Sequence, residues 1–401
     1  MLLFLMARFL GPKPRPHYVV QIIFFALCFW IITADLLTLA RMWNLVEFLH
    51  TGGRAVFFIF ILTTYAVCRD LASYRRVLNL LVLGICLMAM FTIICAVFHI
   101  NPLGAHQTDV AREFYGTAMP YGRTIGVLKS YGEYGLIINA ALPLLLIAAW
   151  RKGFMVSRLL ALISIGILLF ALIITQSRNS WVATLMVMFF MSVFLAFRTR
   201  AAVWKILLIL GGFLIIIIAV GWMSHRLERV YQGFALGKTS YHTFEGRLRM
   251  DSLAWHIFQA HPLFGVGHEE VTRQVTKLFG AETALHNGYL DQLASNGLFG
   301  FIPFLTLMLL TFFTLFKMAR KAPEPLNWYA LCLAASMVGS MTVLLGYKGF
   351  FSITFAIEYG LFLSLVELDH QAPAPDLLTI KAPMKDDGAP VTSAAQRPSY
   401  L

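Results

Sequence analysis

The chain alternates between long, uninterrupted apolar runs and shorter polar segments. Because a helix of about 20 apolar residues crosses the hydrocarbon layer of a membrane, such runs predict membrane-spanning helices. The runs are continuous rather than alternating, which disfavours the strands of a membrane β-barrel. Ten runs qualify: 18–40, 54–68, 77–98, 134–150, 157–175, 179–197, 203–222, 288–316, 327–347 and 350–366. The pattern therefore predicts an all-α polytopic membrane protein with about ten transmembrane helices.

Basic residues recur at every second turn between these runs. The clusters are Arg8/Lys13/Arg15, Arg69/Arg75/Arg76, Arg151/Lys152/Arg158, Arg198/Arg200/Lys205 and Lys317/Arg320/Lys321. Short loops rich in lysine and arginine stay in the cytoplasm, so this side is predicted to be cytoplasmic, together with both termini. The opposite side then receives the segments 41–53, 99–133, 176–178 and the long polar loop 223–287.

This topology divides the chain into four parts. They are N-terminal transmembrane helices (1–222), a large outer loop (223–287), C-terminal transmembrane helices (288–368) and a tail (369–401). The tail is rich in Ala, Pro, Ser and Asp, and this composition predicts a disordered cytoplasmic segment. Asp35 and Glu47 interrupt the apolar character near the first outer turn, so residues 36–50 are either a loop or an interfacial or re-entrant helix.

The composition agrees with the membrane class. Hydrophobic residues make up 59% of the 401 residues and charged residues 13%, and the mean hydropathy is +0.74. Such a chain cannot fold around one soluble core. The net charge of +12 would suggest a nucleic-acid partner in a soluble protein, but here the basic residues flank the apolar runs, and nucleic acid is excluded as a partner. The five cysteines all fall in apolar runs without CxxC spacing, which predicts small core residues.

The outer loop is unusually basic for a segment that crosses the membrane. Its lysines and arginines are Arg226, Arg229, Lys238, Arg247, Arg249, Arg273 and Lys277. An anionic substrate would explain this charge. The alternative is a set of interfacial arginines whose long side chains reach toward the membrane surface.

Residues 245–249 lead into an amphipathic helix that extends to about Ala260 and ends in a segment rich in Pro and Gly, 261–267. Residues three and four apart share a helix face. Arg247 shares its face with Met250, Asp251 and Ala254, and Arg249 shares its face with Ser252, Leu253 and His256. The two arginines therefore do not easily face the same pocket.

Arg178 lies at the outer end of one predicted span, directly before the next. Arg123 and Lys129, in the outer segment before the fourth span, can approach the same place. Arginine suits a diphosphate because its planar guanidinium donates two parallel hydrogen bonds to phosphate oxygens. Anchoring to lipid headgroups is the alternative for each of these residues.

The stretch 286–300 connects the polar loop to an apolar run, and its histidine is the leading candidate for catalysis. His286 has three interpretations. It is a structural residue at the interface, a metal ligand, or a general base, since an imidazole with an ordinary pKa near 6.5 accepts a proton at neutral pH. The loop offers further histidines at positions 225, 242, 256, 261 and 268, but no HExxH spacing. Asn287 is predicted to cap the following helix, and Gly297 and Gly300 to allow close helix packing.

Glu358 lies about 12 Å from the outer end of the last predicted span, if the helix rises by about 1.5 Å per residue. An intramembrane carboxylate is a candidate for function. Packing against an Arg or Tyr of another helix is the structural alternative, and Glu358 is left off the catalytic set. A transporter would require more such residues or broken helices in paired positions.

Several motifs together resemble those of a known family. His286-Asn287, nine further residues, then Gly297, two residues and Gly300 are similar to the motif of bacterial O-antigen ligases, whose sugar-polymerase relatives share the architecture. Thr-Gln-Ser-Arg at 175–178, Gly-Arg at 246–247 and Pro-Leu-Phe-Gly-Val-Gly at 262–267 resemble further landmarks, in the same order. The resemblance covers roughly residues 120 to 366 and is less specific for ligase than for the superfamily.

The resemblance implies a metal-independent, inverting glycosyltransferase of the multi-helix, lipid-donor (GT-C-like) kind, without a cofactor. It implies that His286 is the catalytic base and that Arg178 and Arg247 bind the diphosphate, with Arg123 as a weaker candidate. Arg249 of the basic outer loop is a further candidate for diphosphate binding, independent of the resemblance. The donor would be O-polysaccharide on undecaprenyl diphosphate, and the acceptor would be lipid A-core. The protein would lie in the bacterial inner membrane, in contact with membrane lipids, and its active site would face the periplasm. Such ligases generally have about twelve spans, so a further pair would lie at the N-terminus, where residues 1–10 fit the end of a shortened helix.

Three other functions remain open from the sequence. A polymerase that extends O-antigen or exopolysaccharide would use the same donor and similar residues. A protein O-oligosaccharyltransferase of the same superfamily would need an additional outer motif and a large C-terminal part, neither of which is visible. A transporter has Glu358 as its only support.

Overall fold

The computed structural model describes residues 18–42, 45–98, 131–175, 177–198, 211, 244–279, 285–347 and 351–371. Within these residues the regular secondary structure is entirely helical. The helices are α2 (Tyr18–Met42), α3 (Leu45–Val67), α4 (Leu71–Val97), α6 (Tyr131–Trp150), α7 (Arg158–Thr175), α8 (Arg178–Arg198), α10 (Phe244–Ala260), α11 (His268–Phe279), α12 (Gly288–Lys321), α13 (Leu326–Val343) and α14 (Ile353–Gln371).

Nine of the ten predicted spans coincide with one of these helices, and the tenth, 203–222, lies outside the described residues except for Gly211. Seven helices in the described part of the chain are long and apolar enough to cross a membrane. The apolar part of α3 is shorter, Val56–Val67. The prediction of an all-α polytopic membrane protein is thus confirmed, whereas the total of ten spans stays a prediction. Of residues 36–50, 36–42 belong to α2 and 45–50 to α3, which fits a helix there rather than a loop.

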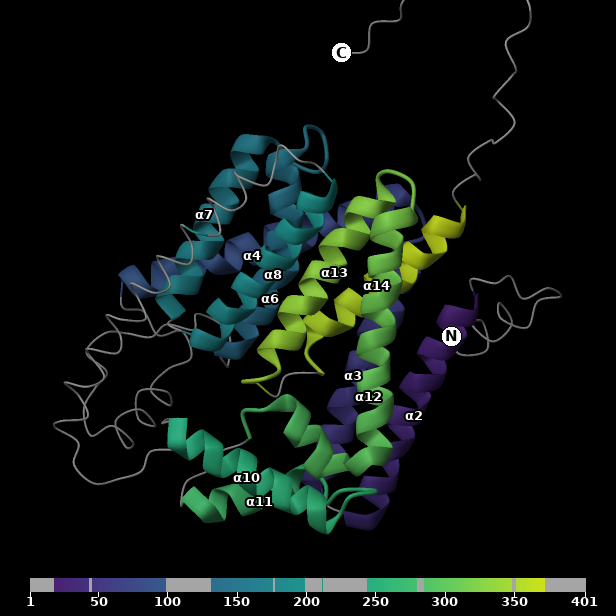
Figure 1. Cartoon of the computed structure of the whole chain (residues 1–401), viewed down its shortest axis with the longest axis vertical. Coiled ribbons are helices and arrows are strands. Elements are labelled where there is room, and N and C mark those ends of the chain that lie inside the picture. Colours follow the sequence, from purple (N-terminus) through teal and green to yellow (C-terminus); the bar gives the residue numbers. More distant parts are fainter. Residues whose placement is uncertain are drawn as a thin grey trace, which may run out of the picture.

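Helices α13 and α6 form the centre of the bundle. Within the most apolar 18 residues of each helix, 83% are buried in α13 and 72% in α6, compared with 33% in α4 and in α7. α13 packs against α6, α8 and α12, and α14 packs against α3 (Figure 1). A Cβ added at Gly339 of α13 would lie 2.6 Å from Val187 Cγ2 of α8, so this approach requires glycine. α4 and α7 expose large apolar side chains such as Leu80 and Leu159, as expected for helices that face lipid.

Helices α10 and α11 lie across one end of the bundle, and the turn between α12 and α13 lies at the other end (Figure 1). A separate apolar core joins this layer to α12: Met250, Ala254 and Ile257 of α10 and Val271 and Val275 of α11 are buried together with Ala294. The predicted amphipathic helix that ends near Ala260 is therefore confirmed. The layer packs mainly on the first part of α12, and α11 also contacts α3.

Helix α12 is broken at Gly297, whose backbone has φ 58° and ψ −164°. In an uninterrupted helix Leu298 N would donate to Ala294 O, and Phe299 N to Ser295 O. Here Leu298 N donates to the carbonyl of Pro262 (2.8 Å) and Phe299 N to that of Leu263 (3.0 Å). In return, Ala294 O accepts from Val266 N (3.0 Å) and Ser295 O from Gly267 N (2.9 Å).

The segment 262–267 is thus inserted into the backbone hydrogen bonding of α12. Glycine is required at the break, because φ is positive and a Cβ at Gly297 would lie 2.5 Å from the carbonyl oxygen of Leu263. This differs from the helix-packing role expected for Gly297. Directly before the break, Asn296 Nδ2 donates to Gln292 Oε1 (3.0 Å) and to Asp35 Oδ1 of α2 (3.4 Å). The carboxylate of Asp35, within a predicted span, therefore has a polar neighbour.

Candidate functional site

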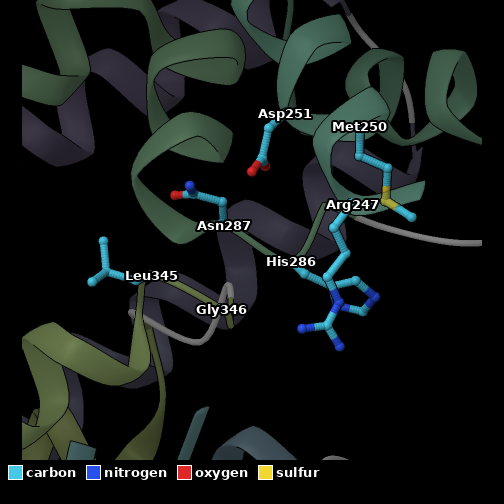
Figure 2. A pocket seen from close by; sticks show the side chains of 7 residues that line it. All are labelled: Arg247, Met250, Asp251, His286, Asn287, Leu345 and Gly346. Carbon is cyan, nitrogen blue, oxygen red and sulfur yellow. The ribbon is translucent and has the colours of Figure 1, made fainter. Parts of the chain in front are cut away.

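A cavity of about 50 Å³ lies where α10, the start of α12 and the turn after α13 meet (Figure 2). Its lining residues are Arg247, Met250, Asp251, His286, Asn287, Leu345 and Gly346. A water molecule occupies about 10–15 Å³ on this measure, so the cavity admits roughly three to five groups of that size.

The backbone around His286 is held by the end of α13. Gly288 N donates to Leu344 O (2.8 Å), and the hydroxyl of Tyr289 donates to Met341 O (2.9 Å). A Cβ at Gly288 would lie 2.9 Å from Tyr347 O, so the two segments are in close contact. These bonds fix the position from which the imidazole enters the cavity.

Asn287 uses both ends of its amide. Its carbonyl oxygen accepts from Tyr289 N (3.1 Å) and Leu290 N (3.2 Å), so it is the N-cap of α12, as predicted. Its other end hydrogen-bonds to the carboxylate of Asp251 on α10. One side chain therefore satisfies the first turn of α12 and ties α10 to it. A Ser or Thr cap would provide the first contact, but its shorter side chain would not provide the same pair of contacts.

Asp251 and Arg247 are one turn apart on α10 and line the same cavity. Burial raises the pKa of the Asp251 carboxyl, while the positive charge of Arg247 and the hydrogen bond from Asn287 act in the opposite direction. Figure 2 shows the guanidinium of Arg247 and the ring of His286 extending to the same side, away from Asp251. The cavity thus combines a cation, an imidazole and a half-buried carboxylate.

The structure separates the four arginines proposed for diphosphate binding. The side chains of Arg247 and Arg249 are both exposed, but only Arg247 lines the cavity, and Arg249 is not among the lining residues. This agrees with the expectation that the two occupy different faces of α10. Arg123 lies outside the described residues, and so does the side chain of Arg178.

The backbone of Arg178 nevertheless starts α8 close to this cavity. The next residue, Asn179, donates from Nδ2 to Val343 O (2.6 Å). A Cβ at the cavity-lining Gly346 would lie 2.8 Å from Asn179 Cγ. The first turn of α8 therefore borders the Gly346 edge of the cavity, and this brings the start of α8 near to His286 and Arg247 in space.

The histidines considered as metal partners do not join His286. His256 and His261 are exposed, and His268 is buried beside Asp291, with 3.2 Å between Nδ1 and Oδ1. His225 and His242 lie outside the described residues. Among the residues that the structure describes, no three His, Cys, Asp or Glu side chains lie close enough together to hold a metal ion.

Glu358 is buried in the centre of the bundle and belongs to a different part of the molecule. It accepts hydrogen bonds from the hydroxyls of Ser336 and Ser340 (3.3 Å) on α13. The expected Arg or Tyr partner was wrong, because two serines one turn apart supply the hydrogen bonds. Glu358 thus ties α14 to α13.

Sequence reasoning did not assign a role to Asp251, Leu345 or Gly346. The spacing of Arg247 and Asp251, four residues apart on a predicted helix, was a signal for a pair on one face. The turn at 345–346 gave no comparable signal, because it reaches the cavity only through the packing of α13 on the start of α12.

The arrangement defines a class: a polytopic helical membrane protein with a polar cavity at one end of its bundle. Residues 163–305 match the family model described as O-antigen ligase. The match confirms the resemblance to that family over a range that includes Arg178, Arg247 and His286, and it supports a function of the ligase or polymerase type. No curated protein matches the chain.

Proposed function

We propose that the chain is an O-antigen ligase that transfers O-polysaccharide from undecaprenyl diphosphate to a sugar hydroxyl of lipid A-core. The observation that carries this proposal is the meeting of His286 and Arg247 in one cavity within the residues that match the family model. The location would be the bacterial inner membrane, with this cavity on the periplasmic side and both termini in the cytoplasm. The basic turn after Trp150 and the α12–α13 turn, at the other end of the bundle, fit this orientation.

His286 acts as the general base. Its imidazole takes the proton of the acceptor hydroxyl as the hydroxyl oxygen attacks the anomeric carbon of the donor. The new glycosidic bond forms on the face opposite the diphosphate, so the configuration at that carbon is inverted. The bond from the anomeric carbon to the diphosphate oxygen breaks, its electron pair leaves with undecaprenyl diphosphate, and the imidazolium then returns the proton to solvent.

Arg247 binds the diphosphate and stabilises the negative charge that develops on the leaving oxygen. In this proposal one phosphate group of the donor lies in the cavity, beside Arg247 and His286. Arg178 is the second phosphate ligand in this mechanism, and Arg123 and Arg249 are secondary candidates. The first turn of α8 adds the positive end of a helix dipole at the Gly346 edge.

A reconstituted assay with the full chain tests the proposal. Lipid-linked O-polysaccharide and lipid A-core, supplied together, should give polysaccharide attached to the core. With donor alone, the lipid-linked chains should not become longer. Chain extension without transfer to the core would instead assign the polymerase function, which rests on the same donor and the same family match.

Two further measurements separate the remaining alternatives. In cells that lack the protein, bare lipid A-core is expected, whereas loss of a polymerase leaves core with a single repeat. Chelation by EDTA should leave the reconstituted activity unchanged. Loss of activity that a divalent ion restores would contradict the metal-independent mechanism.

A further inference from the structure

The outside of the break in α12 carries an apolar surface that the mechanism does not use. This surface, called the break patch below, consists of Trp30, Leu263, Phe264, Leu298 and Phe299. Leu263 is 63% exposed and Phe264 42% exposed, although both belong to the polar outer part of the chain. The ring centroids of Phe264 and Phe299 are 5.4 Å apart, and those of Trp30 and Phe299 are 5.6 Å apart. The patch therefore joins the segment after α10 to α2 and α12.

The exposed side chains of Leu263 and Phe264 cannot withdraw from this position. The carbonyls of Pro262 and Leu263 accept from the amides of Leu298 and Phe299, and Gly297 leaves no space between the two backbones. Both ends of segment 262–267 are hydrogen-bonded to α12. Leu263 and Leu298 must therefore lie at the same depth in the membrane.

That depth follows from the length of the apolar part of α12. At about 1.5 Å per residue, the helix from Leu298 to Lys317 is roughly 29 Å long, close to the thickness of the hydrocarbon layer, about 30 Å. Lys317 starts the basic cluster of the α12–α13 turn and marks one membrane surface. Leu298 then lies at the other surface, where a tryptophan such as Trp30 is commonly found.

We propose that the break patch is an insertion surface for the membrane, occupied by the acyl chains of the leaflet on the cavity side. The patch is continuous with the lipid-facing sides of α2 and α12, where Phe29 and Ile302 are 70% and 50% exposed. Leu263 and Phe264 extend that apolar surface onto the layer formed by α10 and α11.

Insertion has a consequence for the cavity. The segment after α10 is fixed at the membrane surface, and α10 carries Arg247 and Asp251. The part of α12 that precedes the break begins at its N-cap, Asn287. Both walls of the cavity are therefore held at a set distance from the lipid boundary, which is where the phosphates of any lipid-linked molecule lie. The lipid contact itself does not depend on the proposed reaction.

Spin-label depth measurements on the full chain in proteoliposomes test this proposal. A nitroxide is attached at Leu263→Cys in vesicles of phosphatidylethanolamine and phosphatidylglycerol without polyprenyl lipid. Collisions with oxygen report lipid exposure, and collisions with a water-soluble nickel chelate report water exposure. The five native cysteines are buried, so the unsubstituted chain is the labelling blank.

Two matched positions calibrate the result. Ile302→Cys lies one turn deeper on the exposed side of α12, and Arg273→Cys lies on α11, where the side chain of Arg273 is 59% exposed. The label at residue 263 should collide with nickel as rarely as the label at residue 302 does. Its collisions with oxygen should be as frequent as those of the label at residue 302. Phe264→Cys should give the same pattern, and it replaces Leu263→Cys if that variant does not fold.

Two outcomes would overturn the proposal. One is a label at 263 that collides with nickel as often as the label at Arg273→Cys. The other is a label that is water-exposed in these vesicles and becomes shielded only when undecaprenyl diphosphate is added, because the patch would then bind the donor lipid instead of the bilayer.

Discussion

Arginines at the two ends of the bundle are used in different ways. At the basic end, Arg75 donates to the carbonyl of Phe154 (2.6 Å) and Arg158 to that of Trp150 (2.6 Å). Arg151 forms an ion pair with Glu324 (2.9 Å) and stacks on Trp328, 4.9 Å from its ring centroid. At the other end, Arg247 lines a cavity beside His286. The same residue type closes turns at one end and faces a space for an anion at the other.

The comparison shows why a count of basic residues did not locate the site. Both ends carry arginines, and the net charge of +12 is a total over the whole chain that does not distinguish them. The difference lies in the partners. Main-chain carbonyls and a surface carboxylate hold the arginines of the basic end, whereas Arg247 shares its cavity with an imidazole and with Asp251, whose carboxyl has a raised pKa. Perturbed carboxyl groups in a cavity are typical of functional sites.

Replacement of the imidazole is the most severe test of this contrast. His286→Ala should lower the transfer rate by about 10³-fold, because general-base catalysis contributes about 10²–10⁴-fold. The melting temperature in detergent should stay close to that of the unsubstituted chain, since Leu285 and Asn287 anchor the segment on both sides. Turnover is measured with purified donor and acceptor. His256→Ala, an exposed position on α10, is the control, and near-normal transfer by His286→Ala would show that another group is the base.

Two arginines on one helix sharpen the comparison further. Arg247→Ala should lower kcat/KM for the lipid-linked donor by about 10²-fold, since loss of a charge-stabilising donor in an active site costs roughly this factor. Arg249→Ala, on the other face of α10, should have a much smaller effect. Donor titrations in proteoliposomes measure both variants. Equal losses would mean that both arginines reach the substrate and that the division by helix face is wrong.

The break in α12 is tested through stability. Gly297→Ala forces a side chain into a backbone conformation with φ 58° and against the carbonyl of Leu263. The free energy of unfolding should fall by about 2 kcal/mol or more. Gly166→Ala on α7 is the matched control, because its Cβ meets no atom within 4 Å. Thermal unfolding in detergent compares the two, and equal melting temperatures would argue against the inserted segment 262–267.

Local rules were sufficient for most of the helices. The apolar runs predicted nine of the described helices, and the helix-face argument correctly separated Arg247 from Arg249. The cap at Asn287 also follows from local chemistry, because Asn commonly accepts from the first amides of a helix. Each of these features depends on residues within one or two helical turns.

The features that sequence reasoning missed depend on distant partners. From the sequence, Gly297 is predicted to be a helix-packing glycine. Its role in the break depends on contact with segment 262–267, which is distant along the chain. Asp251 acquires its hydrogen bond from Asn287, a residue of another helix, and Glu358 obtains its serine partners only when α13 and α14 pack together. Spacing along the chain does not encode these contacts, because they follow from how the helices pack.

Asp251 offers the smallest effect and the most specific one. Asp251→Asn keeps the shape and can still accept from Asn287, but it removes a negative charge from the cavity that Arg247 and His286 also line. The imidazolium formed during transfer loses a stabilising charge, so kcat should fall by about tenfold, equivalent to about 1.4 kcal/mol. The KM for the anionic donor should stay the same or decrease, because less negative charge faces its phosphates.

The pH dependence gives the matching sign. Because burial raises the pKa of Asp251, the folded protein binds this proton more tightly than the unfolded chain does. The contribution of this group to stability is therefore fully present below the ordinary pKa of an aspartate and is lost as the pH rises through the raised value. Asp251→Asn should remove that loss, so its melting temperature, relative to that of the unsubstituted chain, should increase between acidic and neutral pH. A constant difference across this range would show that the Asp251 carboxyl titrates alike in both states.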